Sequence, residues 1–243
     1  MIKLENFEVL GWEHAIRGMR NPMNSWERSD TRWVADSLKD LRPAIDYDYE
    51  WGMKKAIGPN DHELMMKLAK GGPVHAKYRR MITVYVDITA PLYWWKEFDT
   101  YKVGTVANSC STMHKIHAKE FTMDDFSCEH LFTEYGDPSM NLNYSGQYPL
   151  AVLRDLIRVL NNFRTWFLET KDKRYWWQMI QLLPSSYNQK RTVMLNYEVL
   201  AGIYESRKNH KLDEWREFCE WIEKLPYSEL ITGNLRKSRT AIK

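Results

Sequence analysis

Two cysteines and three histidines lie close together in the middle of the sequence. Cys110, His114 and His117 are four and three residues apart, which would place them on one helix face. With Cys128 or His130 as a fourth ligand, this set could bind zinc, and Cys110 with His114 could instead form a nucleophile and its base. The alternative is a buried thiol beside two histidines that lie on the surface or in the core. Because no paired-ligand motif and no oxyanion site marks the segment, we predict no metal site here.

Asn196 and Arg207 form a second polar pair. If residues 191–207 form a helix, eleven residues bring the two onto one face about 16 Å apart. Leu200 and Ile203 lie along the same stripe. A mixed stripe of this kind is typical of an interface, but its arginine could also hold a phosphate through a bidentate contact.

Aromatic residues are unusually frequent, with 11 Trp and 14 Tyr among 243 residues. Such rings can stack on nucleobases or on a flavin, or they can fill a core and subunit contacts. The glycine-rich phosphate loops GxGxxG and GxxxxGK[ST] do not occur. Both interpretations of the aromatic excess therefore stay open.

The basic charge is concentrated at the C-terminal end. Residues 234–243 contain four bases and no acid, whereas residues 1–233 hold 31 bases and 32 acids. A nucleic-acid-binding body needs a basic excess, so we expect no nucleic-acid polymer as a partner. The length permits one large domain or two small ones, and we predict a single domain over residues 1–233 with a basic tail at 234–243.

Cysteine usage and hydropathy indicate the cellular compartment. The three cysteines are odd in number and widely spaced, which does not suit a disulfide framework and favours a reducing cytoplasm. The first residues lack the apolar run of a signal peptide. No stretch approaches 18 uncharged apolar residues, so we expect no membrane partner and a cytoplasmic protein.

Hydrophobic periodicity and turn residues predict an α+β fold, a small sheet packed with long helices. Strands are expected early, over residues 2–10 and 81–88. Helices are expected over 12–20, from an N-cap at Asp61 to Gly71, from Pro91, from Pro149, and over 175–183, 191–207 and 213–223. Residues 21–51 are expected to form helical turns and loops, and residues 104–113 a polar loop.

The order of these segments resembles the flavin-dependent thymidylate synthases. The first part of the resemblance consists of the stretch from Ile57 to Leu68, Gly71-Gly72, the strand 81–88, the stretch from Ala90 to Lys102, and Asn108-Ser-Cys-Ser111. The second part consists of Leu183-Pro184, Asn196, Arg207 and Glu214-Trp215, at spacings similar to those of the family's last helices. Together they cover about residues 55–113 and 180–222.

The resemblance implies a site in which cationic side chains hold the phosphates of FAD and dUMP. Carried over residue by residue, it implies cofactor contacts for His75, Tyr101, Lys102, Asn108 and Asn196, and substrate contacts for Glu97, Ser109, Cys110, Ser111 and Arg207. The chain also departs from the family pattern. Thr100-Tyr101-Lys102 replaces the family's Arg-His-Arg, Cys110 stands at its serine, Thr112 and Ile180 at two arginines, Glu97 at a glutamine and Asn108 at a glutamate.

The activity implied by the resemblance is C5 methylation, or a related one-carbon transfer, of a pyrimidine deoxynucleoside monophosphate. FAD would be the cofactor and methylene-tetrahydrofolate the co-substrate, and the chain would assemble as a homotetramer. No catalytic residue is assigned. The alternatives are a non-catalytic nucleotide-binding or assembly protein on the same fold, and a Cys110-dependent transferase without flavin.

Overall fold

The computed structural model describes residues 2–37, 39–133 and 148–233. The basic tail predicted at residues 234–243 lies outside them. The chain forms two compact units. Unit 1 comprises residues 1–3, 88–99 and 108–191, and unit 2 comprises residues 4–87, 100–107 and 192–243. The single domain expected over residues 1–233 stays a prediction.

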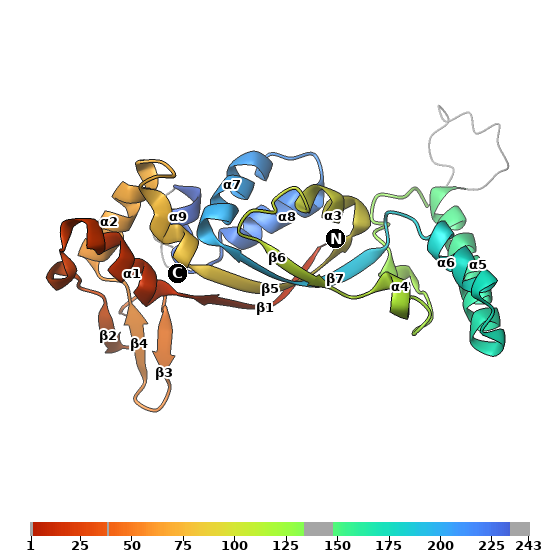
Figure 1. The fold of residues 1–243 in the computed structure, drawn as a ribbon, viewed down its shortest axis with the longest axis horizontal. Helices are drawn as coiled ribbons and strands as arrows, with labels where there is room; N and C mark the ends of the chain where they lie inside the picture. Colours follow the sequence, from red (N-terminus) through yellow and green to blue (C-terminus); the bar gives the residue numbers. More distant parts are fainter. Residues whose placement is uncertain (1, 38, 134–147, 234–243) are drawn as a thin grey trace, which may run out of the picture. The chain divides into compact units, whose positions relative to one another are not determined.

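A four-stranded sheet contributes residues to both units (Figure 1). Its strand order is β1 (Lys3–Leu10), β5 (Thr83–Pro91), β7 (Asn188–Asn196) and β6 (Val106–Ser109). The two early strands confirm the predictions for residues 2–10 and 81–88. Helices and sheets together confirm the α+β prediction.

β7 corrects the helix predicted over residues 191–207. The chain remains a strand to Asn196, and the helix α7 (Tyr197–Arg207) starts only after it. Val193 and Leu195 are buried on alternate positions, which is the period of a strand. Asn196 is therefore the N-cap of α7, and its Oδ1 accepts hydrogen bonds from the N–H groups of Glu198 and Val199 at 3.1 Å. The expectation that the strands all lie early in the chain was wrong.

Unit 2 contains α7 and a second, three-stranded antiparallel sheet. The order of this sheet is β2 (Arg32–Ala35), β4 (Met53–Ala56) and β3 (Asp46–Asp48). Its β2 and β3 correct the prediction of turns and loops alone over residues 21–51. The helices and helical turns are α1 (Trp12–Arg20), η1 (Asn21–Met23), η2 (Trp26–Arg28), α2 (Pro59–Lys70), η3 (Ala76–Met81), α8 (Asp213–Ile222) and α9 (Glu229–Thr232).

The start of α2 differs from the prediction. The N-cap is Gly58, not Asp61, and Pro59 occupies the first helical position. Asp30, about thirty residues earlier in the sequence, caps the helix instead. Its carboxylate accepts the N–H groups of Asn60 at 2.9 Å and of Asp61 at 3.1 Å. A Cβ at Gly58 would lie 2.2 Å from Asp30, so this position requires glycine.

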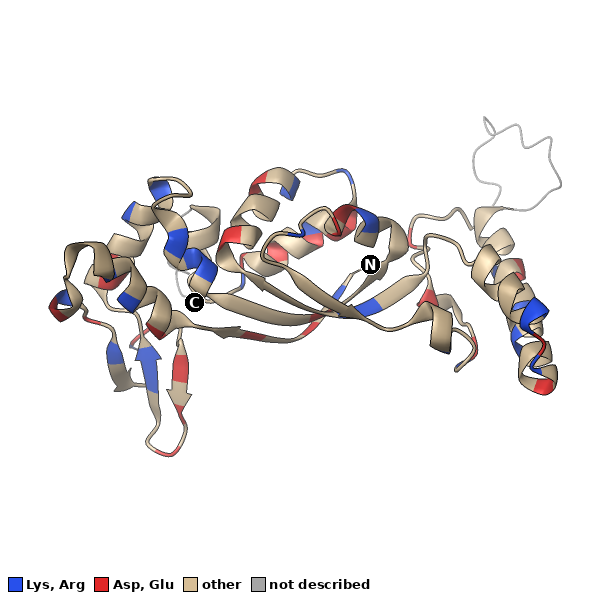
Figure 2. Cartoon of the chain, viewed as in Figure 1, with Lys and Arg blue, Asp and Glu red and all other residues tan. Residues whose placement is uncertain are grey.

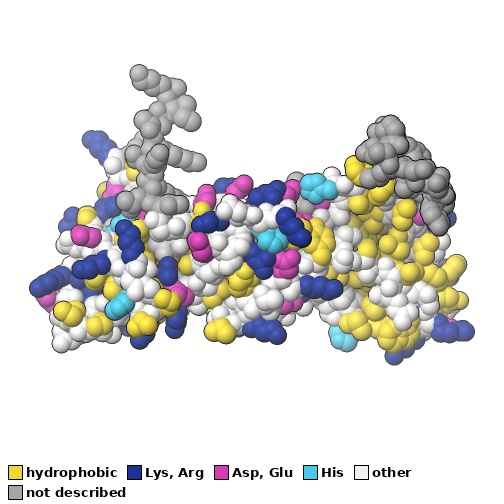
Figure 3. Space-filling model, turned by 90° about the horizontal axis from the view of Figure 1, so that it is seen from above, with side chains coloured by type: hydrophobic (Ala, Val, Ile, Leu, Met, Phe, Trp, Pro, Cys, Tyr) yellow, Lys and Arg dark blue, Asp and Glu magenta, His cyan; other side chains and the backbone are white. Residues whose placement is uncertain are grey.

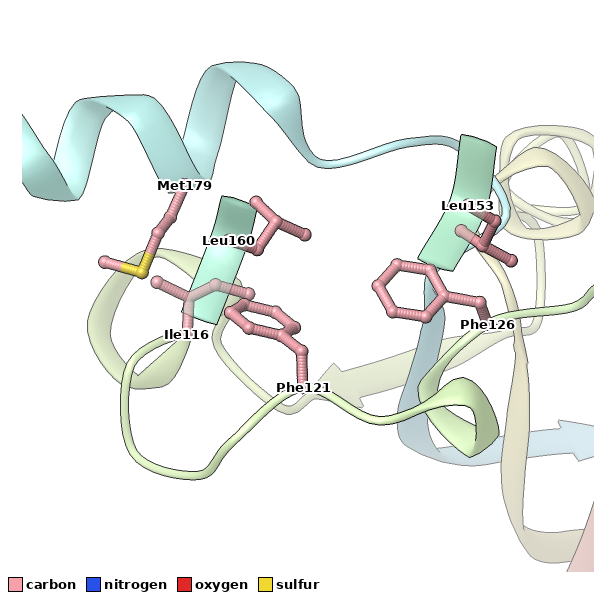
Figure 4. Packing of buried hydrophobic residues seen from close by; sticks show 6 residues of the cluster. All are labelled: Ile116, Phe121, Phe126, Leu153, Leu160 and Met179. Atoms are coloured by element: carbon pink, nitrogen blue, oxygen red, sulfur yellow. The ribbon is translucent and has the colours of Figure 1, made fainter. Parts of the chain in front are cut away.

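Unit 1 is built around a helical hairpin. Its elements are α3 (Leu92–Phe98), α4 (Thr112–Lys115), η4 (Met123–Asp125), α5 (Pro149–Thr170) and α6 (Lys173–Leu182). The helix predicted from Pro91 begins at Leu92, with Pro91 as its N-cap. α5 and α6 pack on the segment after α4 through a cluster of buried side chains (Figure 4). The cluster consists of Ile116, Phe121, Phe126, Leu153, Leu160 and Met179.

No helix within the described residues is both long enough and apolar enough to cross a lipid bilayer. α5, the longest helix described here, carries several charged residues among its 22.

Candidate functional site

Cys110 and Ser111, two of the predicted substrate contacts, line a pocket in unit 1. The pocket has a volume of about 560 Å³ and opens between the segment after β6, the start of β7 and η4. Its charged side chains are Lys3, Lys115, Lys119, Lys190, Asp124 and Asp125. Figure 2 shows the charged residues along these elements. Four lysines against two aspartates make the lining suitable for an anion.

The backbone around Cys110 is held firmly in place. Its N–H donates to the carbonyl of Lys190 at 2.9 Å, and its carbonyl accepts Nε2 of Gln189 at 2.9 Å. The carbonyl of Gln189 in turn accepts the indole N–H of the fully buried Trp95. Ser111 caps α4, since its Oγ accepts the N–H of His114 at 3.0 Å. This edge of the pocket is thus preorganised by β7.

The pocket also contains neutral hydrogen-bonding groups. Oδ1 of Asn188 is buried and has no hydrogen-bond partner among the described residues. Burial, followed by the nearby Asp125 carboxylate and Cys110, raises the pKa of Tyr187. Its hydroxyl therefore stays protonated at neutral pH and can donate. An acceptor and a donor beside an anion-binding edge are what a ligand with both a heterocycle and a phosphate needs.

In unit 2, Arg207 binds the loop that carries Tyr101 and Lys102. Nε of Arg207 donates to the Tyr101 hydroxyl at 2.9 Å, and its guanidinium lies 4.6 Å from the centre of the Trp215 ring. One of its terminal nitrogens is 3.0 Å from Nε2 of His210. This guanidinium is already engaged by three side chains, so its observed role is to position the loop.

The other end of that loop rests against the start of α7. A Cβ on Gly104 would lie 3.0 Å from Nδ2 of Asn196, and Gly104 has a positive φ of 78°. The loop is thereby fixed at Tyr101 and at Gly104, and Lys102 lies exposed between these two points. The structure thus brings four predicted residues, Tyr101, Lys102, Asn196 and Arg207, to one loop and one helix.

Substituting Arg207 by lysine is expected to loosen this loop. Lysine keeps the charge but loses the planar contact with Trp215 and the directed bond to Tyr101. We expect the free energy of unfolding to fall by about 1–2 kcal/mol, with faster amide hydrogen exchange over residues 100–107. Exchange in this loop that matches the unsubstituted protein would show that Arg207 does not hold it.

The remaining predicted residues lie elsewhere. His75 lines a groove of about 1140 Å³ in unit 2 between α1, α2 and η3, and none of the other predicted residues is among those described along it. Glu97 is half-buried on α3, and Asn108 and Ser109 form the exposed end of β6. No described contact joins His75 to the loop of Tyr101.

The zinc and nucleophile alternatives gain no support from the geometry. Residues 2–37, 39–133 and 148–233 contain no group of three His, Cys, Asp or Glu side chains that could hold a metal ion. α4 covers only Thr112–Lys115, so Cys110 and His117 are not on it. The His117 ring packs on Phe167, at 4.8 Å between centroids. The hydrogen bond described for His114 joins its N–H to Ser111 and does not involve Cys110.

Several lining residues of the pocket were not predicted from the sequence. Lys3, Tyr187, Asn188 and Lys190 come from segments far from Cys110 along the chain, and the sheet brings them together. Lys115 lies near Cys110 in sequence, but a single exposed lysine carries no local signal. Only the pairing of β7 with the segment after β6 could have identified them.

The loop 101–104 fits one phosphate group better than a whole FAD. Lys102 is the only cation in this loop, whereas the FAD diphosphate carries two negative charges. Oδ1 of Asn196 is already used to cap α7. The described residues of this loop therefore match the charge of one phosphate group and not that of a diphosphate.

The fold matches solved structures, although no known family model and no curated protein sequence matches the chain. Thymidylate synthase X from Helicobacter pylori, solved with FAD and dUMP, has a TM-score of 0.61 and 15% identity over 96% of this chain and 98% of its own. The UMP/dUMP methylase PolB from Streptomyces cacaoi, solved with 5-Br UMP, has a TM-score of 0.57 and 13% identity over 96% and 95%. The chain thus has the fold of the flavin-dependent thymidylate synthases.

Proposed function

We propose that this chain binds a pyrimidine nucleoside monophosphate in the pocket of Cys110 and Ser111 and methylates C5 of its base. One observation carries the proposal. The segment to which the resemblance assigns the substrate lines a lysine-rich pocket, in a chain with the fold of enzymes solved with dUMP or 5-Br UMP. A pocket of about 560 Å³ lies within the range of small-ligand sites.

The pocket residues suggest a division of roles. Lys115 and Lys190, with the hydroxyl of Ser111, would hold the phosphate through charge-assisted hydrogen bonds. Tyr187 as a donor and Oδ1 of Asn188 as an acceptor would meet the polar edge of the pyrimidine. Glu97, Ser109 and Arg207 stay proposed substrate contacts from the resemblance.

FAD and methylene-tetrahydrofolate are the proposed cofactor and co-substrate. A bound reduced flavin would supply the hydride that completes the methyl group. The proposed flavin contacts are His75, Tyr101, Lys102, Asn108 and Asn196. Because Lys102 is the only cation of its loop, we propose that a second copy of the chain supplies the remaining contacts.

A homotetramer is the proposed assembly, and the surface of α5 and α6 supports it. Only Leu153 and Leu160 of the 22 residues of α5 are buried. Figure 3 shows hydrophobic side chains gathered over these two helices. The exposed apolar side chains are Val152, Trp166, Leu168, Trp177 and Leu182. An apolar surface of this kind is typical of an interface between copies.

A thermal-shift titration with dUMP, UMP, dCMP and deoxyuridine tests the nucleotide site. We expect a mononucleotide to raise the melting temperature by mass action and deoxyuridine, which lacks the phosphate, to do so far less. The double variant Lys115→Gln/Lys190→Gln is expected to weaken nucleotide binding at least about tenfold. The control Lys70→Gln/Lys224→Gln removes two exposed lysines outside the pocket. Equal affinity in the two double variants, or no shift with any mononucleotide, would contradict the proposal.

A non-catalytic nucleotide-binding protein is the second candidate, favoured by the single cation of the loop 101–104. Titration with FAD, followed by flavin fluorescence, separates the two. Binding of both FAD and a mononucleotide supports the methylating enzyme. Binding of the mononucleotide without FAD supports the non-catalytic protein.

A further inference from the structure

The hairpin that joins β3 to β4 carries an alternating acidic and aromatic sequence. Residues 46–51 read Asp-Tyr-Asp-Tyr-Glu-Trp and are called the acidic hairpin below. Tyr49 and Trp51 are 87% and 74% exposed, and Tyr47 is exposed as well. Large aromatic side chains so open to solvent indicate a surface that binds something.

The three carboxylates of the acidic hairpin lack a cationic partner within the described residues. Asp46 accepts only the N–H of Tyr47, and Asp48 accepts the N–H groups of Glu50 and Trp51 at 3.1 and 3.2 Å. The two lysines that follow in β4 are engaged elsewhere. Lys54 is buried and pairs with Asp36, and Lys55 pairs with Glu13. The local charge of the hairpin is therefore uncompensated.

The rings of the acidic hairpin are arranged to receive cations. Tyr47 and Tyr49 stack at 5.4 Å between centroids with 14° between their planes, so each ring covers one face of the other and keeps its outer face for a cation. Arginine and lysine side chains bind to such faces, and nearby carboxylates strengthen the contact. The chemistry of this surface selects a peptide rich in lysine and arginine.

The chain itself contains such a segment. Residues 234–243 carry Arg236, Lys237, Arg239 and Lys243 and no acid. They follow Gly233, the C-cap of α9, and α9 belongs to the same unit as the acidic hairpin. Their charge is opposite to that of the hairpin.

The C-terminal segment starts close enough to reach the hairpin. The Tyr227 hydroxyl donates to the carbonyl of Pro43 at 2.8 Å and accepts the N–H of Ile57 at 2.9 Å, so it joins both ends of the hairpin region. Gly233 lies six residues beyond Tyr227, about 9 Å at helical rise. Trp51 lies six residues before Ile57, about 20 Å at strand rise. Arg236, Lys237 and Arg239 lie three to six residues beyond Gly233 and span up to about 10–20 Å, which reaches the end of the hairpin at Asp46, opposite Lys55. Lys243, ten residues beyond Gly233, spans up to about 33 Å and reaches Trp51.

We propose that the acidic hairpin is the binding surface for the chain's own basic segment 234–243. The three carboxylates pair with its lysines and arginines, and the exposed rings of Tyr47, Tyr49 and Trp51 cover their side-chain stems. This binding is independent of the nucleotide pocket, which lies in the other unit.

Trypsin cleavage of the full chain, followed by intact mass, tests this proposal. Trypsin cuts after Arg236, Lys237 and Arg239, and the cutting rate follows the fraction of time that the segment is unbound. In the triple variant Asp46→Asn/Asp48→Asn/Glu50→Gln, trypsin is expected to cut at these three sites about ten times faster at low salt. Raising the salt to about 0.5 M should remove the difference, since exposed ion pairs are screened.

Three further results decide the interpretation. The control triple Glu120→Gln/Glu169→Gln/Glu220→Gln changes the net charge equally at exposed positions and should leave the rate unchanged. The swap Asp46→Lys/Asp48→Lys with Arg239→Glu/Lys243→Glu should restore protection at Arg236 and Lys237, the sites it retains. Circular dichroism confirms that each variant is folded. Equal cutting of the hairpin and control triples would overturn the proposal. Protection that rises with protein concentration would also overturn it, because the bound segment would then belong to a second copy.

Discussion

Replacing Asp61 by asparagine is expected to lower the free energy of unfolding by about 3–5 kcal/mol. Asp61 is 0% exposed, and its Oδ1 accepts Nε of Arg20 at 2.7 Å. Its Oδ2 accepts four hydrogen bonds, from the hydroxyls of Ser29 and Thr31 and from the backbone N–H groups of Asp30 and Thr31. An asparagine would direct an NH₂ group at donors and leave the buried Arg20 without a counter-charge.

The same carboxylate predicts how stability depends on pH. Burial alone would raise the pKa of Asp61, but hydrogen bonds from Thr31, Ser29 and Arg20 outweigh it and lower this pKa below its ordinary value of 3.8. A lowered folded-state pKa stabilises the fold above the ordinary value and ceases to do so as the pH falls through the folded value. The contribution should therefore be complete above about pH 5 and fade below about pH 4.

Urea unfolding of the two proteins at several pH values measures both effects. The difference between them should be largest at neutral pH and shrink in acid. Glu205→Gln is the control, because Glu205 is exposed and its ion pair with Lys208 lies on the surface, so a change within about 0.5 kcal/mol is expected. A loss of less than about 1 kcal/mol for Asp61→Asn would show that the network is not a main support of unit 2.

Asp61 also shows why the sequence could not fully predict the fold. An aspartate just before an apolar run is typical of an N-cap, and the neighbouring residues in the sequence do not indicate any other role for Asp61. The actual cap of α2 is the carboxylate of Asp30, from a segment about thirty residues away, and this frees Asp61 to bind Arg20. Long helices with clear periodicity, such as α5 and α8, were predicted because their signal is local.

The strands that were missed depend on partners distant in sequence. β7 lies between β5 and β6, and its residues Asn188 to Arg191 carry no β-branched side chain. β2 and β3 likewise exist through pairing with β4. Whether such a segment forms a strand depends on its pairing with distant strands, and the propensities of its own residues do not reveal that pairing.

In the candidate site too, residues with a local sequence signal were predicted and residues brought in by distant strands were not. The resemblance identified Cys110 and Ser111, which the structure places in a lysine-lined pocket. Lys190 and Asn188 were not predicted as pocket residues. They lie at the start of β7, and this strand was not predicted because a helix was expected over residues 191–207. The arginine-poor motif around Lys102 was visible in the sequence, but only the structure shows that Arg207 is engaged by Tyr101 and Trp215.

The double variant Trp166→Glu/Trp177→Glu is expected to convert the proposed tetramer into smaller species. Both indoles lie on the α5–α6 hairpin and are 45% and 43% exposed in the single chain. Tryptophans at the centre of an interface often contribute 2 kcal/mol or more each, and a carboxylate in their place adds a desolvation penalty. We expect the dissociation constant of the assembly to rise by more than about 100-fold.

Light scattering after size-exclusion chromatography measures this change as a fall in mass toward that of one chain. Tyr49→Glu/Trp51→Glu is the matched control, since it adds the same charges at two exposed aromatic positions outside the α5–α6 surface. A tetramer that persists in the α5–α6 variant would exclude this surface as the interface. If the control variant dissociates instead, the copies meet through the acidic hairpin. Loss of FAD binding together with the tetramer would further indicate that a neighbouring copy completes the flavin site, because Lys102 is the single cation of its loop.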